Sequence, residues 1–412
     1  EPDSVQAKLP ADIARHLGRR RNANECFGVC CRQQIPWYFT GMDMKWYINW
    51  LGIRGVNLFI PHAFYYSVEG QRKEERPPDV GPNNIWWNHY KQFSDYIKRI
   101  SWLMTDSVNG AKIAVLCDNN QIPFAETALL YENQVEFNYL PVSLLKDCHT
   151  QGQILCIREY RYEAVLNVLG KEYDQNLDGV TIVHDEKQLL NDQFRTIKTS
   201  EPCPCLRAVG LQKDGNRMYL LSNEGTKTIR TRIWFPGGAS LLSMDLWKNA
   251  FYPSPAIYQT DGAWMEVQLE PCEMLLVIYD GMGSNNRKNC GKTSDKESKN
   301  LAGMIREAIP NWTERFTLQK KENNKAEYQY SFKAEEISGI EIFEVTGEEM
   351  IECRCNGQTA GVSFLNPHRF EVGKFLHKGI NTIQLTVTGN AANQYENADI
   401  FYGCKSQNSA NE

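Results

Sequence analysis

Two short runs, each ending in a polar side chain beside aromatic residues, constrain the fold of this chain most. They are Asn24-Glu25-Cys26-Phe27-Gly28 and Gly55-Val56-Asn57-Leu58-Phe59-Ile60-Pro61-His62-Ala63-Phe64. A buried strand of a (β/α) barrel delivers a reactive side chain to its C-terminal rim in this way. Residues 40–51 between them have helical periodicity, with Thr40 as the N-cap. The order is therefore strand, helix, strand, with Glu25 and His62 as the two polar groups.

The length and charge of the chain limit its organisation and its partners. A chain of 412 residues predicts two to four domains. The net charge of -5 provides no basic field for nucleic acid or an anionic membrane, and no apolar run is long enough to span a bilayer. The 10 Trp, 19 Tyr and 17 Phe suit stacking on sugars and are equally ordinary core material.

The 13 cysteines lack the paired C-x-x-C spacing of zinc sites. We interpret them mostly as free buried thiols, which favours a reducing compartment and a cytoplasmic location. The chain begins at Glu1 without a methionine, which leaves a processed or missing upstream segment open.

Changes in periodicity divide the chain into five parts. Residues 1–108 form strand and helix units, and residues 109–197 form a small parallel α/β domain. Residues 198–281 form a β-sandwich, residues 282–309 a polar linker, and residues 310–412 a second β-rich module. No phosphate-binding loop follows a strand, and Asp118 fits a helix cap better than a site residue.

One set of motifs consists of Asn24-Glu25-Cys26-Phe27-Gly28, the run from Gly55 to Ser67, Arg76-Pro77-Pro78 and Trp86-Trp87. Together these motifs resemble the end of the catalytic barrel in large bacterial glycoside hydrolases of family 106, the α-L-rhamnosidases. The last module contains Cys355-Asn356-Gly357-Gln358, Gly361, Asn366-Pro367-His368-Arg369-Phe370 and Lys378-Gly379-Ile380-Asn381. It is similar to the galactose-binding-like jelly roll of those enzymes and of family 2.

The resemblance implies a multidomain protein of the α/β plus all-β class. Its parts would be the terminal part of a (β/α)8 barrel, a small flavodoxin-like α/β domain, a β-sandwich and a C-terminal galactose-binding-like jelly roll. Because a complete barrel needs about 250 residues, residues 1–108 correspond only to its C-terminal portion. The expected substrate is a plant or microbial polysaccharide or glycoside. The resemblance allows a calcium ion near the sugar but assigns it no ligands, and the sequence indicates no other metal or cofactor and no oligomeric state.

Glu25 is the candidate catalytic residue. Glycoside hydrolysis uses one carboxyl group as an acid and a second as a nucleophile or base. By resemblance Glu25 lies on a late barrel strand and takes the base or nucleophile role, while the acid lies in the absent part of the barrel. The alternative is a rim ion pair between Glu25 and Arg20 or Arg21.

The candidate substrate-binding residues are His62, Tyr65, Trp87 and Trp37. The imidazole of His62 could hydrogen-bond a sugar hydroxyl, or it could be a core histidine bound to the backbone. Adjacent aromatic residues on a helix point in different directions, so one member of each pair, Trp37-Tyr38 and Trp86-Trp87, is expected in the core.

A non-catalytic carbohydrate-binding or assembly protein is the competing functional hypothesis. A second carboxylate facing Glu25 would distinguish the enzyme from it.

Overall fold

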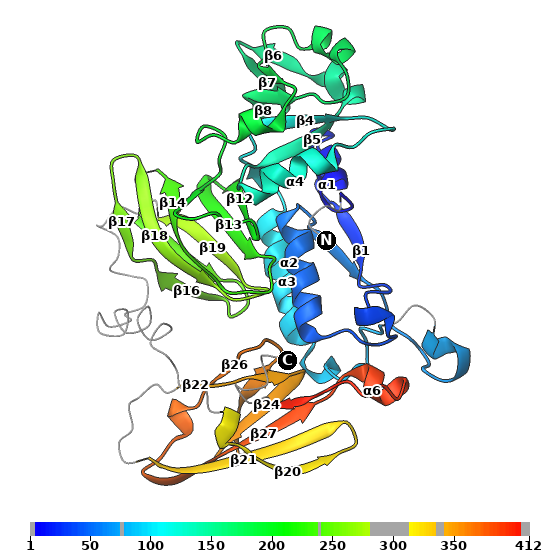
Figure 1. Ribbon diagram of the computed structural model, residues 1–412, viewed down its shortest axis with the longest axis vertical. Coiled ribbons are helices and arrows are strands. Elements are labelled where there is room, and N and C mark those ends of the chain that lie inside the picture. The colour runs from blue at the N-terminus through cyan, green and yellow to red at the C-terminus, as the bar shows by residue number, and fades with distance from the viewer. Residues whose placement is uncertain (1–4, 75–77, 238–239, 281–312, 335–341, 405–412) are drawn as a thin grey trace. The chain divides into compact units, whose positions relative to one another are not determined.

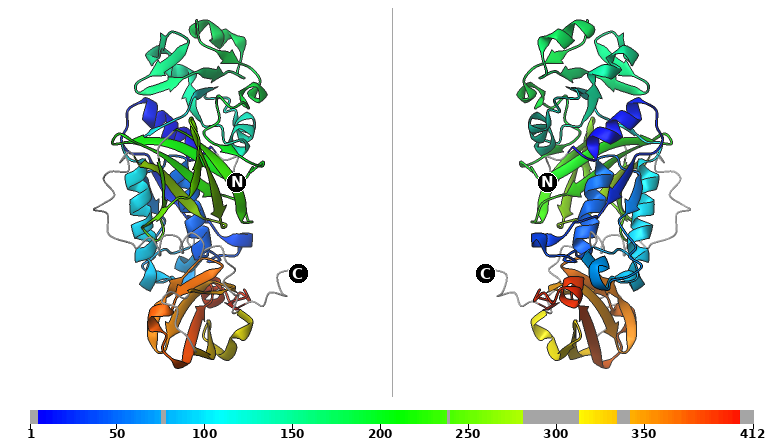
Figure 2. Two further views of the ribbon diagram at one scale, coloured as in Figure 1. Left: turned by 90° about the vertical axis from the view of Figure 1, so that its left-hand side faces the viewer. Right: turned by 90° about the vertical axis from the view of Figure 1, so that its right-hand side faces the viewer.

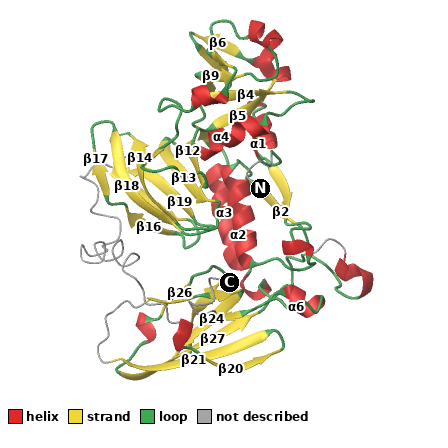
Figure 3. Cartoon of the chain, in the orientation of Figure 1, coloured by secondary structure: helices red, strands yellow, loops and turns green. Residues whose placement is uncertain are grey.

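The computed structural model describes residues 5–74, 78–237, 240–280, 313–334 and 342–404 (Figure 1). The fold is mixed α/β with strands predominating over helices, as Figure 3 shows. Internal contacts divide the chain into two units. Unit 1 comprises Glu1–Asn24, Ile48–Ile60 and Asp95–Ala302, and unit 2 comprises Glu25–Tyr47, Pro61–Ser94 and Gly303–Glu412. The multidomain α/β prediction is confirmed at this level. The predicted linker, residues 282–309, lies outside the described residues.

The strand, helix, strand order predicted near the N-terminus is present. Strands β1 (Ala23–Cys26) and β2 (Leu58–Pro61) form a two-stranded sheet, with α2 (Gly41–Ile53) between them in sequence and α3 (Lys91–Met104) following. The Asn22 carbonyl accepts from the Leu58 N–H at 3.1 Å, and the Cys26 carbonyl accepts from the His62 N–H at 2.8 Å. Because both contacts advance together along the chain, the two strands are parallel.

The predicted cap of α2 is confirmed. The hydroxyl of Thr40 accepts from the Asp43 N–H at 3.1 Å, and the Asp43 carboxylate accepts from the Thr40 N–H at 2.9 Å. This reciprocal pair satisfies two backbone donors that a helix N-terminus otherwise leaves open.

A parallel sheet forms the α/β part of unit 1. Its strand order is β10 (Ile182–Val183), β9 (Ala164–Leu166), β4 (Ile113–Cys117) and β5 (Phe137–Pro141). Helix α4 (Phe124–Glu132) connects β4 to β5, and the hairpins β6 (His149–Gln151), β7 (Ile154–Ile157) and β8 (Tyr160–Tyr162) follow. Helix α1 (Lys8–His16) also belongs here, because Asp12 accepts from the Tyr139 N–H at 2.9 Å. The parallel sheet was predicted, and its flavodoxin-like assignment stays a prediction.

Two antiparallel sheets of unit 1 share one core, as in the predicted β-sandwich. Their inner faces contribute Leu206, Leu221, Ile233, Phe235 and Val267. One sheet has the order β16-β15-β19-β13-β12-β3 and the other β11-β14-β18-β17. The bounds are β3 (Val108–Asn109), β11 (Lys198–Thr199), β12 (Leu206–Lys213), β13 (Asn216–Asn223), β14 (Ile229–Pro236), β15 (Ser240–Asp245), β16 (Ala250–Pro253), β17 (Ala256–Tyr258), β18 (Gly262–Leu269) and β19 (Met274–Asp280).

The described residues from 313 to 404, called the C-terminal module below, form the β-rich part of unit 2, coloured yellow to red in Figure 2. Asn356 and Gly357 both have positive φ, 50° and 79°, as a two-residue hairpin turn requires. The main sheet has the order β20-β21-β27-β24-β25, and its jelly-roll assignment stays a prediction. The bounds are β20 (Thr317–Glu322), β21 (Lys325–Ala334), β22 (Ile342–Val345), β23 (Gly347–Glu348), β24 (Met350–Cys355), β25 (Gln358–Ser363), β26 (His368–Glu371), β27 (Gly379–Thr388), α6 (Ala391–Tyr395) and β28 (Gly403–Cys404).

Candidate functional site

The segment that follows β2 in unit 2 lines a cavity. This cavity of about 270 Å³ is lined by residues 62–67 and by Arg72. His62 is the first residue after the strand, so the strand end places its side chain at the cavity. Two of the predicted substrate-binding residues, His62 and Tyr65, are therefore brought together.

The imidazole of His62 has an unused hydrogen-bonding atom. Its Nδ1 is buried and has no hydrogen-bond partner within the described ranges. Gly28 lies against the ring, and a Cβ there would be only 3.4 Å from the His62 Cγ. This nitrogen is enclosed by protein beside Gly28 and does not open on the cavity. The two interpretations of His62, sugar contact and core histidine, therefore both stay predictions.

Exposed aromatic side chains border the cavity. Phe64 is 67% exposed and Tyr66 81% exposed, which is unusual for such large apolar groups. Phe64 meets the edge of Trp87 with ring centroids 5.6 Å apart, and Trp87 stacks on Tyr90 at 5.7 Å. Arg72 lies over the ring of Tyr66 at 4.9 Å. Aromatic faces of this kind bind the apolar face of a sugar ring or a planar group.

Trp37 does not belong to this surface, which corrects the prediction that it contacts substrate. Its side chain is 0% exposed and packs with Ala391 and Ala392. Its ring lies 4.6 Å from that of Tyr395 and 5.6 Å from that of Tyr65. Trp37 is core material behind Tyr65, the alternative foreseen for one member of each aromatic pair. Trp86, 1% exposed, is the buried member of the other pair.

Asp79 organises the cavity and was missed by sequence reasoning. Its side chain is 0% exposed. Its Oδ1 accepts from the N–H of Gly81 at 2.7 Å and of Tyr65 at 3.2 Å, and its Oδ2 accepts from the Asn83 N–H at 3.1 Å. The signal available in the sequence was an Asp two residues before a Gly, which is typical of an Asx turn.

Glu25 lies on β1, beside the strand that leads to His62. It is exposed, while the next residue, Cys26, is buried, as the alternation of a strand requires. No hydrogen bond or ion pair of Glu25 occurs within the described residues, and it is not among the residues that line the cavity. Arg20 instead pairs with Asp106 at 2.8 Å, and Arg21 donates to the Thr105 hydroxyl at 2.8 Å.

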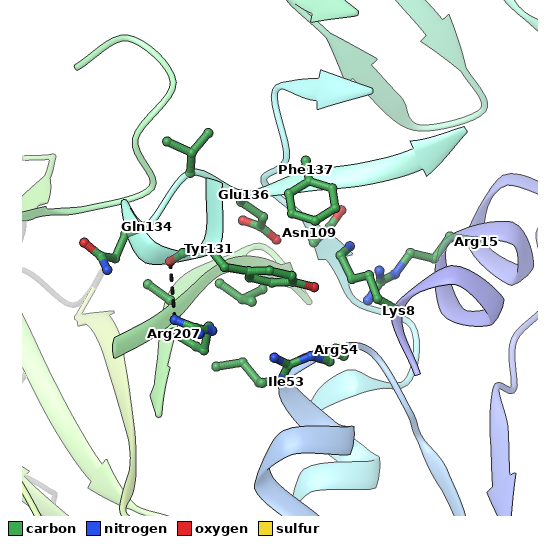
Figure 4. A pocket seen from close by; sticks show the side chains of 13 residues that line it. Lys8, Arg15, Ile53, Arg54, Asn109, Tyr131, Gln134, Glu136, Phe137 and Arg207 are labelled. Atoms are coloured by element: carbon green, nitrogen blue, oxygen red, sulfur yellow. Dashed lines mark hydrogen bonds between the residues drawn. The ribbon is translucent and has the colours of Figure 1, made fainter. Parts of the chain in front are cut away.

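A second cavity, in unit 1, is small and charged (Figure 4). Its volume of about 20 Å³ holds one water molecule and excludes a sugar. The guanidinium groups of Arg54 and Arg207 flank the ring of Tyr131 at 5.1 and 5.3 Å and share the buried carboxylate of Glu224. Burial raises the pKa of Glu136, another lining residue, to about 7, against the opposing charge of Lys8. The charged residues around this cavity pack elements of unit 1 against one another.

The described residues do not assemble the carboxylate cluster that a calcium ion prefers. Within them, no group of three or more His, Cys, Asp or Glu side chains is placed to hold a metal ion. No helix in the same ranges is both long enough and apolar enough to cross a membrane. Buried thiols include Cys117, Cys353 and Cys355, in line with the predicted free cysteines.

Comparisons with known proteins relate the fold to glycoside hydrolases. No family model and no curated protein matches the sequence. Among solved structures, a rhamnosidase from Novosphingobium sp. PP1Y is similar with a TM-score of 0.67 and 15% identity, over 94% of this chain and 46% of that chain. The chain thus spans about half the length of that protein and shares the fold of the matched part.

Weaker similarities are found to two further glycosidases. An α-L-fucosidase isoenzyme 2 from Paenibacillus thiaminolyticus matches with a TM-score of 0.39 and 8% identity, covering 59% of this chain and 58% of that chain. A catalytic mutant of Gan42B, a GH42 β-galactosidase from G. stearothermophilus, matches with a TM-score of 0.39 and 9% identity, covering 58% and 51%.

Proposed function

We propose that this chain is the C-terminal part of a glycoside hydrolase similar to the family 106 α-L-rhamnosidases, and that the cavity after β2 binds its sugar. In this proposal β1, α2, β2 and α3 are the end of a (β/α)8 barrel. The α/β part is flavodoxin-like, and the C-terminal module is a galactose-binding-like jelly roll. The fold shared with the Novosphingobium rhamnosidase supports this assignment.

The cavity lined by residues 62–67 is the observation that carries the proposal. It combines the imidazole of His62 with the exposed rings of Phe64 and Tyr66. Ligand sites in proteins typically pair apolar walls with a few polar groups that fix orientation. Here the imidazole of His62 would bind one hydroxyl, and Phe64 with Trp87 would contact the ring face.

Hydrolysis would require two carboxyl groups across the glycosidic bond. Glu25, on the strand parallel to β2, supplies one as the base or nucleophile. The residues that line the cavity include no carboxylate. The acid would therefore come from barrel strands outside this chain.

Titration calorimetry of the 412-residue chain against L-rhamnose, other deoxyhexoses and hexoses tests the proposal. We expect saturable binding of a deoxyhexose, weakened by His62→Ala and by Phe64→Ala. Phe251→Ala is the matched control, because Phe251 is 55% exposed and lies on β16 in unit 1. Equal affinities in all three variants, or no binding of any sugar, would overturn it.

A non-catalytic carbohydrate-binding role is the second candidate. The absence of a carboxylate among the cavity-lining residues favours it, because such a cavity can bind a sugar without hydrolysing it. A carboxylate 5 to 5.5 Å from Glu25 would indicate a retaining enzyme, and one at about 6.5 to 9.5 Å an inverting enzyme. A complex in which no carboxylate faces Glu25 across the sugar would favour the binding role.

A further inference from the structure

Residues 63–65 of the cavity lining, called the cavity wall below, are held in place by a second loop, residues 79–84. The Val80 N–H donates to the Ala63 carbonyl at 2.9 Å. The Asn83 side chain donates to the Tyr65 carbonyl at 3.0 Å, and the Tyr65 N–H donates to Asp79. These bonds fix the backbone on both sides of Phe64, so the position of the aromatic wall depends on this loop.

Asp79 is the centre of that loop. Its two oxygens accept three backbone N–H groups, and the Asn84 side chain donates to its carbonyl at 2.7 Å. A buried carboxylate with several N–H donors forms charge-assisted bonds, which are stronger than neutral ones. Gly81 makes room for the Phe64 ring, because a Cβ there would lie 2.4 Å from it. Asp79 touches no cavity surface and acts through Tyr65 and Phe64.

Tyr395 of the C-terminal module contacts this loop through its hydroxyl. Tyr395, the last residue of α6, donates to the Asn83 carbonyl at 2.7 Å. Its ring also packs on Trp37, which packs on Tyr65, so α6 reaches the wall by a polar and an apolar route. All these residues belong to unit 2.

Helix α6 is in turn tied to the module. Asn390, 0% exposed, caps the helix by accepting from the Ala392 N–H at 2.9 Å. Asn324, just before β21, donates to the Asn390 carbonyl at 2.9 Å. Consecutive short contacts therefore connect the main sheet to α6, α6 to the 79–84 loop, and that loop to the cavity wall.

We infer that Asp79 and Tyr395 are positioning residues for the cavity, so that the C-terminal module sets the affinity of the cavity instead of acting as a separate sugar-binding module. The identity of the ligand rests on the proposed function. The connection between the C-terminal module and the cavity does not rest on the proposed function, because it consists of contacts between described residues.

Hydrogen exchange of the backbone amides in the full chain tests the link without a ligand. The variants are Asp79→Asn and Tyr395→Phe, with Tyr328→Phe as the control. Tyr328 lies on β21 in the same module and packs against its core. We expect exchange at Tyr65, Gly81 and Asn83 to rise about tenfold in Asp79→Asn and about fivefold in Tyr395→Phe. Tyr328→Phe should leave these amides unchanged.

Sugar affinity measured on the same variants separates positioning from general stability. We expect Tyr395→Phe to raise the Kd about fivefold with a Tm equal to that of Tyr328→Phe. Equal Kd values for the two variants, or unchanged exchange in Tyr395→Phe, would overturn the inference. If the parent chain binds no sugar, the proposed function fails, and the exchange pattern alone decides the positioning role.

Discussion

The backbone nitrogen of His62 lies 2.8 Å from the carbonyl oxygen of Cys26. This bond continues the pairing of two parallel strands beyond β2 and aligns their C-terminal ends. Glu25 precedes the accepting residue, so the candidate carboxylate and the candidate sugar-binding histidine belong to adjacent strand ends. In the proposed function these ends would carry the reactive groups, as strand ends do in barrel enzymes.

His62→Ala should weaken sugar binding about tenfold and leave the free energy of unfolding nearly unchanged. Its Nδ1 has no internal hydrogen bond to lose, whereas a ligand hydroxyl would lose its partner. Calorimetry and urea unfolding measure the two effects separately. His149→Ala, at an exposed position of β6, is the control. Destabilisation of His62→Ala by several kcal/mol would indicate a core histidine.

The two tryptophans should respond in opposite ways to truncation. Trp37→Ala should destabilise unit 2 by about 3 to 5 kcal/mol, because it empties a fully buried site. Trp87→Ala, at a 37% exposed position, should cost far less stability and should instead reduce sugar affinity. Chemical denaturation and calorimetry of both variants test the contrast, and similar stability losses would contradict it.

Glu136 should make unit 1 less stable as the pH rises. Its pKa is about 7 in the folded chain and near 4.5 when unfolded. The folded state therefore binds the proton more tightly, and the free energy of unfolding falls between about pH 4.5 and 7 and is then level. Glu136→Gln should remove this dependence and raise stability at pH 8 by up to about 3 kcal/mol. Urea unfolding of the parent and of Glu136→Gln at pH 5 and pH 8 measures this effect. An equal difference in unfolding free energy between the two proteins at both pH values would contradict the assignment.

The pair of arginines in unit 1 depends on a single carboxylate. Glu224→Gln would leave Arg54 and Arg207 buried without their shared counter-charge. We expect a loss of about 3 to 5 kcal/mol in the free energy of unfolding. Glu159→Gln, outside any ion pair within the described residues, is a matched substitution that should have little effect. Equal stabilities of the two variants would show that the buried cluster contributes nothing.

The elements that sequence reasoning predicted well are those determined by local chemistry. Thr40 and Asp43 are three residues apart, and Asn356 precedes Gly357 directly, so helix start and hairpin turn could be read from neighbours. His62, which stays a prediction, was selected because a run of apolar residues leads to it. Trp37 was misassigned because its burial is made by Tyr395 and Ala392, which are more than three hundred residues away in the chain. Asp79 was missed for a similar reason, since its role depends on the backbone of Tyr65 across a loop.

The measurement that tests the central claim most directly is the turnover of an aryl α-L-rhamnoside by the longest form of the chain that its gene encodes, with and without Glu25→Gln. Glu69→Gln, at another exposed glutamate of unit 2, is the control. If Glu25 acts only in the transition state, its variant should lose about 10² to 10³ in kcat with little change in KM, while the control keeps parental turnover. Parental turnover in Glu25→Gln would contradict the account and remove Glu25 from the mechanism.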